Sequence, residues 1–489
     1  MSESKVRTRY APSPTGHFHI GGARTALFNY LFAKHHDGTF IVRIEDTDTK
    51  RNVQGGIDSQ LDNLMWLHIP PDESIRNPGN TPPYIQSADL QRYQTLALDL
   101  VKQNKAYYCF CTKEDLQKQR EYALTHGLTP KYNRVCLRLT PEEISQKIKH
   151  NTPAAIRLKM PDNSVIKWHD LIRGDMAIPT SALTDPVILK SDGMPMYNFA
   201  VVVDDFNMKI THVLRGEEHL SNTPYQIAIK KALGFDTQPI QYGHLSVIND
   251  ETGKKLSKRN LLLKQFIDDY KNDGYVPEAL INFLALLGWS MPNGKEVLSI
   301  HEMIRHFDID RIAKAPAFFD QRKLLWLSNQ YIKTMSKDIY LTWIKEYVDD
   351  SLNVLQDKLD QVLLLFKDQI SYAREINNLI IKNFLSTQIN KETLTTAINV
   401  VDRNTFIKCI KALKEVLSLY TEITLSNADN IVLDVKSKTD LDKKALYFPL
   451  RFVAIAKEHG PQMNMLFYVV GKIQLLKNID MTLSLLNAK

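Results

Sequence analysis

The stretch RTRYAPSPTGHFHIGGAR at residues 7–24 decides the fold, because it joins a short strand to a helix through a tight turn. Two prolines and Gly16 end the strand, and the small residues from Gly21 onward predict the start of a helix. Such a junction brings the backbone close to a ligand and directs the N–H groups of a helix N-terminus at it, which favours phosphate binding. His19 lies at this helix start, where its imidazole can donate to phosphate oxygens. In isolation, the same residues also fit a proline-rich turn before a core helix.

Strand-like and helix-like segments alternate beyond this junction. β-branched runs at residues 39–44, 201–203 and 212–214 predict strands, and residues 23–34 predict a helix. The alternation predicts an α/β domain with a parallel sheet. It is interrupted between residues 94 and 195, where the sequence Thr112-Lys-Glu-Asp115 predicts a capped helix start. We interpret this segment as an insertion into the α/β domain.

Charged side chains follow the predicted strands. The mostly apolar strand at residues 40–44 ends in three acids, Glu45, Asp46 and Asp48. Because ligands bind beyond the carboxyl ends of parallel strands, Glu45 is placed to meet an ammonium group. Residues 254–259, KKLSKR, carry four cations in six positions and can hold a triphosphate. An acidic loop cap and a solvated basic surface are the alternatives for the two runs. A further cluster consists of Tyr197 and the residues RGEEH at 215–219.

The cysteines do not form a disulfide framework. Only four occur, and Cys109, Cys111 and Cys136 fall within 28 residues while Cys409 stands alone. This usage indicates a reducing compartment. The close pair followed by a later cysteine supplies three of the four ligands of a tetrahedral zinc site. Buried thiols without a metal are the alternative interpretation.

Glycine usage divides the chain. Of its 19 glycines, 17 lie at or before Gly294, and the next is Gly460, so 165 residues contain none. Because glycine and proline mark turns, this tract is predicted to be mostly helical. Apolar residues at helical spacing support the prediction of one helix face over residues 355–370, at Leu355, Leu359, Val362, Leu363, Phe366 and Ile370.

Composition is that of a large globular protein with two to four domains. The chain has 489 residues, of which 44% are hydrophobic and 24% charged. A net charge of +7, with 62 basic against 55 acidic residues, is compatible with a polyanionic partner. No apolar run approaches the roughly 18 residues that a membrane span needs, and residues 1–10 alternate charged and hydroxyl side chains instead of opening an apolar stretch. We therefore expect a cytoplasmic protein.

Taken in order, these motifs resemble those of class I aminoacyl-tRNA synthetases, and within that class the bacterial-type glutamyl-tRNA synthetases. PSPTG followed by HIGG at residues 12–22 is similar to the family's first nucleotide motif, and KLSKR at 255–259 to its second. The resemblance continues to KALYFPLR at 444–451 and EHGP at 458–461. Gly22 stands where the general motif has a second histidine, and we interpret this departure as a mark of the glutamate-specific branch.

The resemblance implies a multidomain architecture of α/β and all-α parts. It consists of a Rossmann-type catalytic domain with a parallel sheet and an inserted domain, followed by helical stem-contact and anticodon-binding regions. The expected boundaries are 1–93 for the first catalytic half, 94–195 for the inserted acceptor-end-binding domain, 196–245 for the second catalytic half, 246–332 for the stem-contact region and 333–489 for the anticodon-binding region.

The resemblance also implies the reaction and its residues. ATP and L-glutamate would form glutamyl-adenylate and pyrophosphate, and the glutamyl group would pass to the 3′ end of tRNA(Glu), with release of AMP. The residues implied around glutamate are Arg9, Ala11, Ser13, Glu45, Tyr197 and Arg215. Those implied around ATP are His19, Gly21, Gly22, Glu218, Lys255, Ser257 and Lys258, among which His19, Lys255 and Lys258 would be catalytic.

Magnesium would accompany ATP, with phosphates and water as its main ligands. Some relatives complete a zinc site with a tyrosine, which implies Tyr132 as the fourth ligand beside the three cysteines, whereas Arg138 stands where others have a histidine. A monomer is expected from the family. Charging of tRNA(Gln) as well, and a non-catalytic tRNA-binding relative, are the alternatives. A glutamyl transferase for a modified base would lack the helical C-terminal region, and a glutaminyl synthetase would have an all-β C-terminal region.

Overall fold

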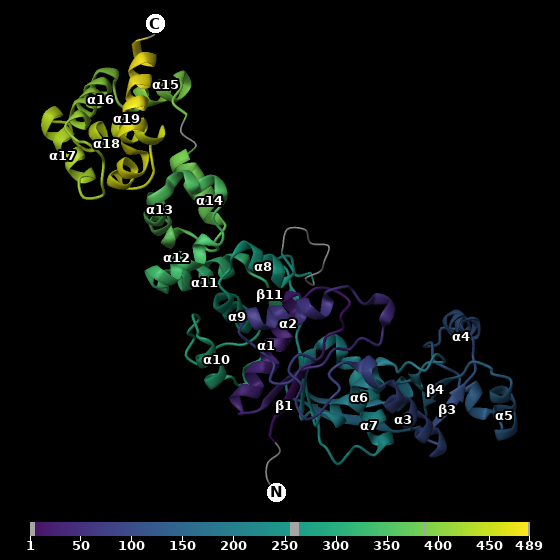
Figure 1. Cartoon of the computed structure of the whole chain (residues 1–489). Coiled ribbons are helices and arrows are strands. Elements are labelled where there is room, and N and C mark those ends of the chain that lie inside the picture. Colours follow the sequence, from purple (N-terminus) through teal and green to yellow (C-terminus); the bar gives the residue numbers. More distant parts are fainter. Residues whose placement is uncertain (1–4, 255–263, 386–387, 488–489) are drawn as a thin grey trace. The chain divides into compact units, whose positions relative to one another are not determined.

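The computed structural model describes residues 5–254, 264–385 and 388–487 (Figure 1). The chain divides into two compact units. The first unit combines Met1–Asn272 with Pro277–Leu324, and the second combines Asp273–Val276 with Leu325–Lys489. The first unit is built on sheets with covering helices, and the second contains helices and no strand among its described residues.

The first unit is organised by a six-stranded sheet with the order β2-β1-β8-β9-β5-β6. Neighbouring strands run parallel except for the antiparallel β5–β6 hairpin at the edge. This arrangement confirms the predicted parallel sheet. Because β2, β1 and β8 are parallel, the residues that follow them meet at one edge. The strands are β1 (Arg7–Tyr10), β2 (Thr39–Val42), β5 (Val165–Asp170), β6 (Gly174–Pro179), β8 (His212–Gly216) and β9 (Gln241–Leu245).

Helix α1 (Ile20–His35) follows β1 directly and packs against β1, β2 and β8. Its buried residues lie on almost every side, which explains why the sequence shows no narrow apolar stripe there. The other helices that flank the sheets are α2 (Gly56–Trp66), α3 (Leu90–Lys102), α6 (Tyr197–Asn207) and α7 (Thr223–Leu233).

The prediction of a strand at residues 201–203 is wrong. Val201, Val202 and Val203 lie inside α6, and all three side chains are buried. A short apolar run fits a fully buried helix segment as well as a strand, because periodicity cannot separate the two. Here the helix contacts α7 and α3 and belongs to the same core cluster as Phe199 and Ile229.

Residues 94–195 contribute to two sheets. A small antiparallel sheet, β3-β4-β7, comprises Ala106–Cys109, Ala155–Leu158 and Val187–Leu189, while β5 and β6 extend the six-stranded sheet. Helices α4 (Lys113–Thr125) and α5 (Pro141–Lys149) begin with capping boxes. The predicted cap at Thr112 is confirmed, because its hydroxyl accepts from the N–H of Asp115 and the Asp115 carboxylate accepts from the N–H of Thr112.

The remainder of the first unit combines a two-stranded parallel pair with short helices. The pair joins β10 (Ile248–Asn249) to β11 (Ala317–Phe318). Trp289 and Phe307 lie buried in its core with their ring centroids 5.7 Å apart. The helices of this region are α8 (Ile267–Asp273), α9 (Pro277–Leu286), α10 (Ile300–His306) and the first residues of α11 (Gln321–Thr334).

The second unit confirms the predicted helical rear. Its helices after α11 are α12 (Lys337–Lys345), α13 (Leu359–Leu365), α14 (Glu375–Ile380), α15 (Lys391–Val400), α16 (Arg403–Ser418), α17 (Ala428–Thr439), α18 (Lys443–Ile455) and α19 (Met463–Asn487). Gly471 interrupts α19 with a φ of 76°, a conformation that glycine adopts without a steric cost.

The single helix face predicted over residues 355–370 is wrong in its continuity. Only Leu359–Leu365 is α-helical, and 3₁₀ turns at Asp350–Lys358 and Lys367–Gln369 flank it. The stripe is nevertheless buried at Val362, Phe366 and Ile370, because the shorter turns still direct these side chains inward. In the described residues, no helix has both the length and the apolar character needed to traverse a bilayer.

Candidate active site

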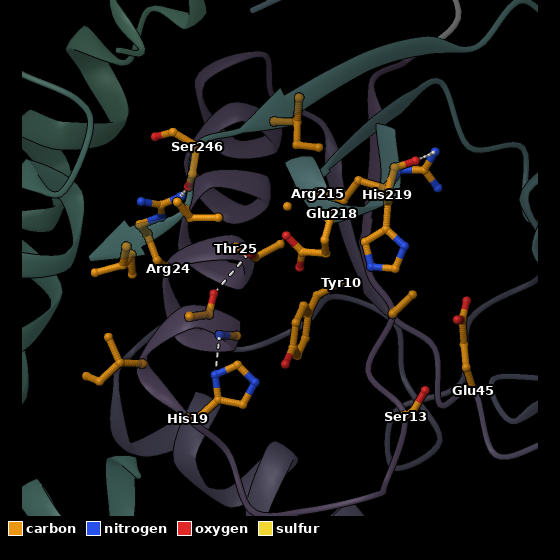
Figure 2. A pocket seen from close by; sticks show the side chains of 18 of the residues that line it. Tyr10, Ser13, His19, Arg24, Thr25, Glu45, Arg215, Glu218, His219 and Ser246 are labelled. Atoms are coloured by element: carbon orange, nitrogen blue, oxygen red, sulfur yellow. Dashed lines mark hydrogen bonds between the residues drawn. The ribbon is translucent and has the colours of Figure 1, made fainter. Parts of the chain in front are cut away.

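A cavity of about 510 Å³ opens at the edge of the six-stranded sheet where β1, β2 and β8 end (Figure 2). Glu45 and Ser13 lie on one side of the view and Arg24 and Ser246 on the other. Every described residue that the sequence assigned to glutamate or ATP lines this cavity: Arg9, Ala11, Ser13, His19, Gly21, Gly22, Glu45, Tyr197, Arg215 and Glu218. Lys255, Ser257 and Lys258 lie outside the described residues.

His19 is the N-cap of α1, and its Nδ1 accepts from the N–H of Gly22 at 3.1 Å. A ring nitrogen that accepts carries no proton in the neutral imidazole, so the ring proton is on Nε2. The cap therefore orients the ring and fixes its tautomer, and the helix N-terminus lies at the cavity. Gly21 also lies close, since a Cβ there would approach His19 Nδ1 to 3.2 Å.

The glycine at position 22 has a steric reason. A Cβ at Gly22 would lie 2.6 Å from the hydroxyl of Tyr10, which is held by a hydrogen bond of 3.0 Å to Gln60 Oε1. No side chain fits without moving Tyr10. The departure from the two-histidine motif is thus accommodated by the tyrosine that fills the space opposite.

Glu45 belongs to a buried charge cluster that the sequence did not predict. Arg43 donates to Glu45 Oε1 at 2.9 Å and to Asp205 Oδ1 at 2.7 Å. Asp205 also accepts from Arg9 Nε at 3.1 Å and Nη2 at 3.4 Å. Asp204 lies 3.7 Å from Arg43 Nε and accepts from Tyr93 and Gln86, each at 2.7 Å. The cluster joins β1, the end of β2 and α6 behind the cavity.

Burial and charge act in opposite directions on these carboxylates. Burial raises the pKa of Glu45 above its usual value, although Arg43 opposes the shift. Burial alone would also raise the pKa of Asp205, but Arg9 and Arg43 together hold it below its usual value. Asp205 is therefore a fixed anion between two arginines.

The residues that sequence reasoning missed are Arg43, Asp204 and Asp205. The available signal was the Asp204-Asp205 pair directly after the run of valines. In a strand, successive side chains point to opposite faces, so two adjacent aspartates would not reach one arginine. In α6 both lie near Arg43, and a helical interpretation of the run was needed to find them.

Tyr197 and Arg215 form another part of the cavity wall. Tyr197 OH lies 3.1 Å from His219 Nδ1, and burial raises the pKa of Tyr197. Burial, with the nearby Arg215, lowers the pKa of His219 to about 4, so this ring is neutral at pH 7. Arg215 is 4% exposed, and its Nη1 has no hydrogen-bond partner among the described residues. An unpaired guanidinium nitrogen in a polar cavity is suited to bind an anionic group.

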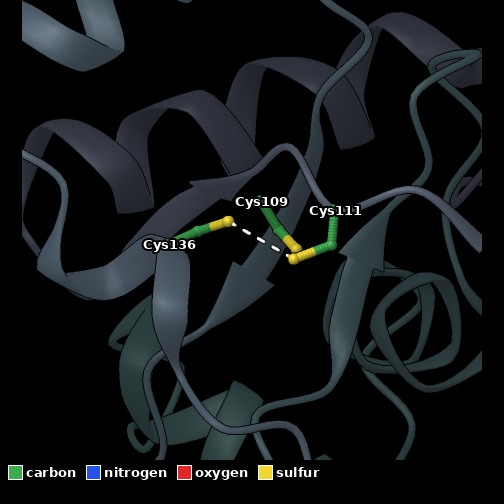
Figure 3. A group of neighbouring side chains, drawn as sticks. All are labelled: Cys109, Cys111 and Cys136. Carbon is green, nitrogen blue, oxygen red and sulfur yellow. Dashed lines mark hydrogen bonds between the residues drawn. The ribbon is translucent and has the colours of Figure 1, made fainter. Parts of the chain in front are cut away.

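A second candidate site lies in the small sheet, where three cysteines converge (Figure 3). The sulfurs of Cys109, Cys111 and Cys136 lie within 4.8 Å of one another, and those of Cys111 and Cys136 are 3.6 Å apart. Tyr132 OH lies 3.5 Å from Cys109 Sγ and 3.7 Å from Cys111 Sγ. All three thiols are free, and Arg138 donates to the backbone oxygen of Asn133.

Two family models match the chain. Residues 5–326 match the catalytic domain of the class I tRNA synthetases for E and Q, and residues 339–483 match an anticodon binding domain. The glutamate–tRNA ligase of Malacoplasma penetrans is 51% identical over 485 residues, which cover 98% of each chain. That of Ureaplasma urealyticum is 49% identical over 484 residues, covering 99% of this chain and all of the relative.

Solved structures agree with these relatives. The crystal structure of a glutamate tRNA ligase from Elizabethkingia meningosepticum in complex with its amino acid superposes with a TM-score of 0.88 at 33% identity, over 99% of this chain and 100% of the other. The glutamate-tRNA synthetase of Elizabethkingia anophelis gives 0.87 at 33% identity, over 98% and 100%. The chain therefore belongs to the class I tRNA synthetases of the E and Q type, and within them to the glutamate–tRNA ligases.

Proposed function

We propose that the chain uses ATP to ligate L-glutamate to the 3′ end of tRNA(Glu), through glutamyl-adenylate. The observation that carries the proposal is the convergence of the glutamate-binding and ATP-binding candidates from β1, α1, β2, α6 and β8 on one cavity of about 510 Å³. A volume of this size accommodates a small substrate and part of a nucleotide. Membership of the glutamate–tRNA ligases supports the same activity.

The reaction needs no protein nucleophile. A carboxylate oxygen of glutamate attacks the α-phosphorus of ATP, the bond to the β-phosphate oxygen breaks, and pyrophosphate leaves. A ribose hydroxyl at the tRNA 3′ end then attacks the carbonyl carbon, loses its proton and displaces AMP. The protein contributes position and electrostatic stabilisation, because the attacking carboxylate is already charged. Magnesium enters with ATP as part of the substrate.

Glutamate recognition rests on buried charge. Arg9 and Arg215 are candidates for the two carboxylates, Tyr197 supplies a hydroxyl, and Glu45 faces the α-ammonium group. Ala11 and Ser13 line the same part of the cavity. Glutamine has nearly the same shape but would leave an arginine without an anionic partner, which is costly in a buried site.

ATP binding rests on the start of α1 and on the later lysine loop. His19 with Nε2 protonated can donate to a phosphate oxygen, Gly21 and Gly22 let the phosphates approach, and Glu218 lines the adjacent wall. Lys255, Ser257 and Lys258 would meet the β- and γ-phosphates and stabilise the charge of the leaving pyrophosphate. By family membership, the acceptor end of tRNA would contact residues 94–195, and its anticodon residues 333–489.

The cysteine cluster fits zinc. Four ligands at tetrahedral angles with Zn–S bonds of about 2.3 Å place two sulfurs about 3.8 Å apart. The 3.6 Å between Cys111 and Cys136, and the position of Tyr132 OH near two sulfurs, agree with such a set. Zinc held by Cys109, Cys111, Tyr132 and Cys136 would stabilise the turn after β3. Metal analysis of protein purified without added zinc tests this proposal, and a stoichiometry near zero contradicts it.

The test of the function is charging of purified tRNA(Glu) and tRNA(Gln) with labelled glutamate. We expect charging of tRNA(Glu), and charging of tRNA(Gln) would extend the activity to a non-discriminating enzyme.

Lys258→Ala should lower the rate by about 10²–10³, because it removes one donor to developing charge. Lys231→Ala, at an exposed lysine of α7 that does not line the cavity, is the control and should leave the rate near that of the parent. Full activity of Lys258→Ala would remove this lysine from the mechanism. Charging of neither tRNA would overturn the proposed function.

We further propose that the enzyme acts in the cytoplasm as a monomer.

A further inference from the structure

Behind Arg215 lies a buried pair that the reaction itself does not use. His244 and Asp170 are both 0% exposed, and His244 Nδ1 lies 2.5 Å from Asp170 Oδ2. The other ring nitrogen, Nε2, accepts from Arg215 Nε at 3.2 Å. Arg215 is thus linked through His244 to the carboxylate of Asp170, although His244 and Asp170 are 74 positions apart in the sequence.

The carboxylate of Asp170 is fixed by the backbone. Its Oδ1 accepts from the N–H groups of Ile172 at 3.1 Å, Arg173 at 3.0 Å and His244 at 3.2 Å. Burial alone would raise the pKa of Asp170, but His244 and these N–H donors hold it below its usual value. An ionised Asp170 accepts only, so His244 Nδ1 must carry the ring proton and Nε2 must offer its lone pair to Arg215.

Thr223 is the third group that holds Arg215 in place. Nη2 of Arg215 donates to Thr223 Oγ1 at 2.9 Å, and Thr223 is 0% exposed. Nε and Nη2 of the guanidinium therefore both donate, whereas Nη1 has no hydrogen-bond partner in the described part of the chain and Arg215 lines the cavity. The guanidinium is held in one orientation by neutral acceptors.

The two arginines of the cavity differ in charge compensation. Arg9 makes a two-pronged ion pair with Asp205. Arg215 forms no ion pair within the described residues, and the adjacent cation Arg173 is itself paired with Glu217. A buried cation without a carboxylate partner binds an anion more strongly than one whose charge is already balanced. A carboxylate in the place of His244 would remove this advantage.

We infer that His244 and Asp170 are positioning and specificity-determining residues for the proposed glutamate charging. They orient Arg215 through a neutral histidine, so that its charge stays available to the carboxylate that distinguishes glutamate from glutamine. The inference rests on the proposed function. In it, Arg215 contacts the substrate, while His244 and Asp170 contribute to the discrimination between glutamate and glutamine by holding Arg215 in place.

Asp170→Asn is the sharpest test, because it keeps an Oδ1 acceptor for the three backbone N–H groups and replaces Oδ2 by an amide donor. His244 Nδ1 would then accept, and Nε2–H would face the N–H of Arg215. We expect the KM for glutamate to rise about 10–100-fold, the range for groups that orient a directly binding residue, with little change in the KM for ATP. Selectivity for glutamate over glutamine should fall. The ¹⁵N spectrum of labelled histidine should report the change of tautomer.

His244→Gln and His244→Leu form a matched pair. The glutamine carbonyl can replace Nε2 as an acceptor, so His244→Gln should retain more selectivity than His244→Leu. His212→Asn removes a partly buried histidine of the same sheet away from the cavity and should leave both KM values unchanged. Unchanged glutamate KM and selectivity in folded Asp170→Asn, or equal values in the two His244 variants, would overturn the inference. Failure of the parent enzyme to charge tRNA(Glu) would instead overturn the proposed function.

Discussion

The two units of the chain bury different kinds of side chain. In the described residues, every buried charged group lies in the first unit: Arg9, Arg24, Arg43, Glu45, Asp46, Arg157, Asp170, Asp185, Asp204, Asp205, Arg215 and Asp250. The buried polar groups of the second unit are neutral: Ser328, Asn377, Thr439, Asn478 and Thr482. The helical unit is stabilised by apolar packing, whereas the catalytic unit retains charges inside.

Retaining buried charges lowers stability unless each is paired. Removing an ion from water costs several kcal/mol, and a well-packed apolar group of the same volume is often at least as stabilising. Four of the twelve buried charged residues, Arg9, Arg24, Glu45 and Arg215, line the cavity at the edge of the sheet. Asp205 pairs with Arg9, and Arg43 pairs with Glu45. The difference between the units at this cavity therefore reflects residues kept for the site rather than for the core.

The largest expected effect comes from breaking the charge cluster. Asp205→Asn preserves the shape but leaves Arg9 and Arg43 without their shared anion. We expect the free energy of unfolding of the first unit to fall by about 3–5 kcal/mol, the cost of an uncompensated buried charge. Urea unfolding followed by circular dichroism measures the change.

Asp62→Asn is the control for this substitution. Asp62 pairs with Arg76 at 2.5 Å, but its side chain is 59% exposed. Loss of an exposed pair should change stability by less than about 1 kcal/mol. Equal losses in Asp205→Asn and Asp62→Asn would mean that the buried cluster contributes no more to stability than an exposed ion pair.

A smaller effect is expected from the glycines, which the two units use differently. Gly22→Ala places a methyl group 2.6 Å from Tyr10 OH and should cost about 1–3 kcal/mol, with weaker ATP binding. Tyr10→Phe in the same chain removes the hydroxyl and should restore both. Gly471→Ala instead introduces strain at a φ of 76°, so it should lower stability without affecting ATP binding.

Thermal melts and ATP titration of the single and double variants measure these effects. Failure of Tyr10→Phe to rescue Gly22→Ala would show that space opposite Tyr10 is not the constraint. Rescue of Gly471→Ala by the same substitution would show that the effect is not local.

The parts of the fold that follow from local pattern could be predicted. The parallel sheet, the helical rear and the cap at Thr112 depend on strand spacing, turn residues and a short-range hydrogen-bond motif. The run Val201–Val203 could not, because an apolar run of three residues has no period of its own. The helix break near Phe366 also has no signal in an apolar stripe that stays buried through 3₁₀ turns.

The candidate site divides in the same way. The presence of His19 and Glu45 at the cavity could be predicted, because His19 lies at a helix start and Glu45 follows a strand end. The groups that hold them could not. Arg9 and Asp205 are 196 positions apart, and His244 and Asp170 are 74 apart, so only the tertiary structure brings them together.

Acid should weaken the first unit more than the second. Burial lowers the pKa values of His212 and His219 from near 6.5 to about 4, with His36 adding to the shift of the first and Arg215 to that of the second. Between these values the unfolded chain binds more protons than the folded one, so stability falls as the pH falls. Allowing for partial exposure, we expect each to cost about 1 kcal/mol between pH 7 and pH 5.

The second unit contains a single histidine, His459, which is exposed. Hydrogen exchange at pH 7 and pH 5 distinguishes the units: protection should fall in the first and stay nearly constant in the second. His212→Asn should remove about half of the pH dependence of the first unit that these two histidines cause. An equal loss of protection in both units would contradict the assignment to buried histidines.

A matched pair of buried threonines, both 0% exposed, compares the two units directly. Thr482 Oγ1 donates to the backbone oxygen of Asn478 at 2.7 Å within α19. The same carbonyl also takes part in the backbone hydrogen bonding of the helix. Thr482→Val replaces this hydroxyl by a methyl group and should change stability by less than about 1 kcal/mol. Thr223→Val instead takes an acceptor from the Arg215 guanidinium, whose hydrogen bonds are worth about 1.5–3 kcal/mol, and should also raise the KM for glutamate. Equal stability losses with unchanged KM in both variants would mean that the buried polar groups of the two units serve the same purpose. A larger loss confined to Thr223→Val indicates that the first unit keeps its buried polar groups to hold charge in place.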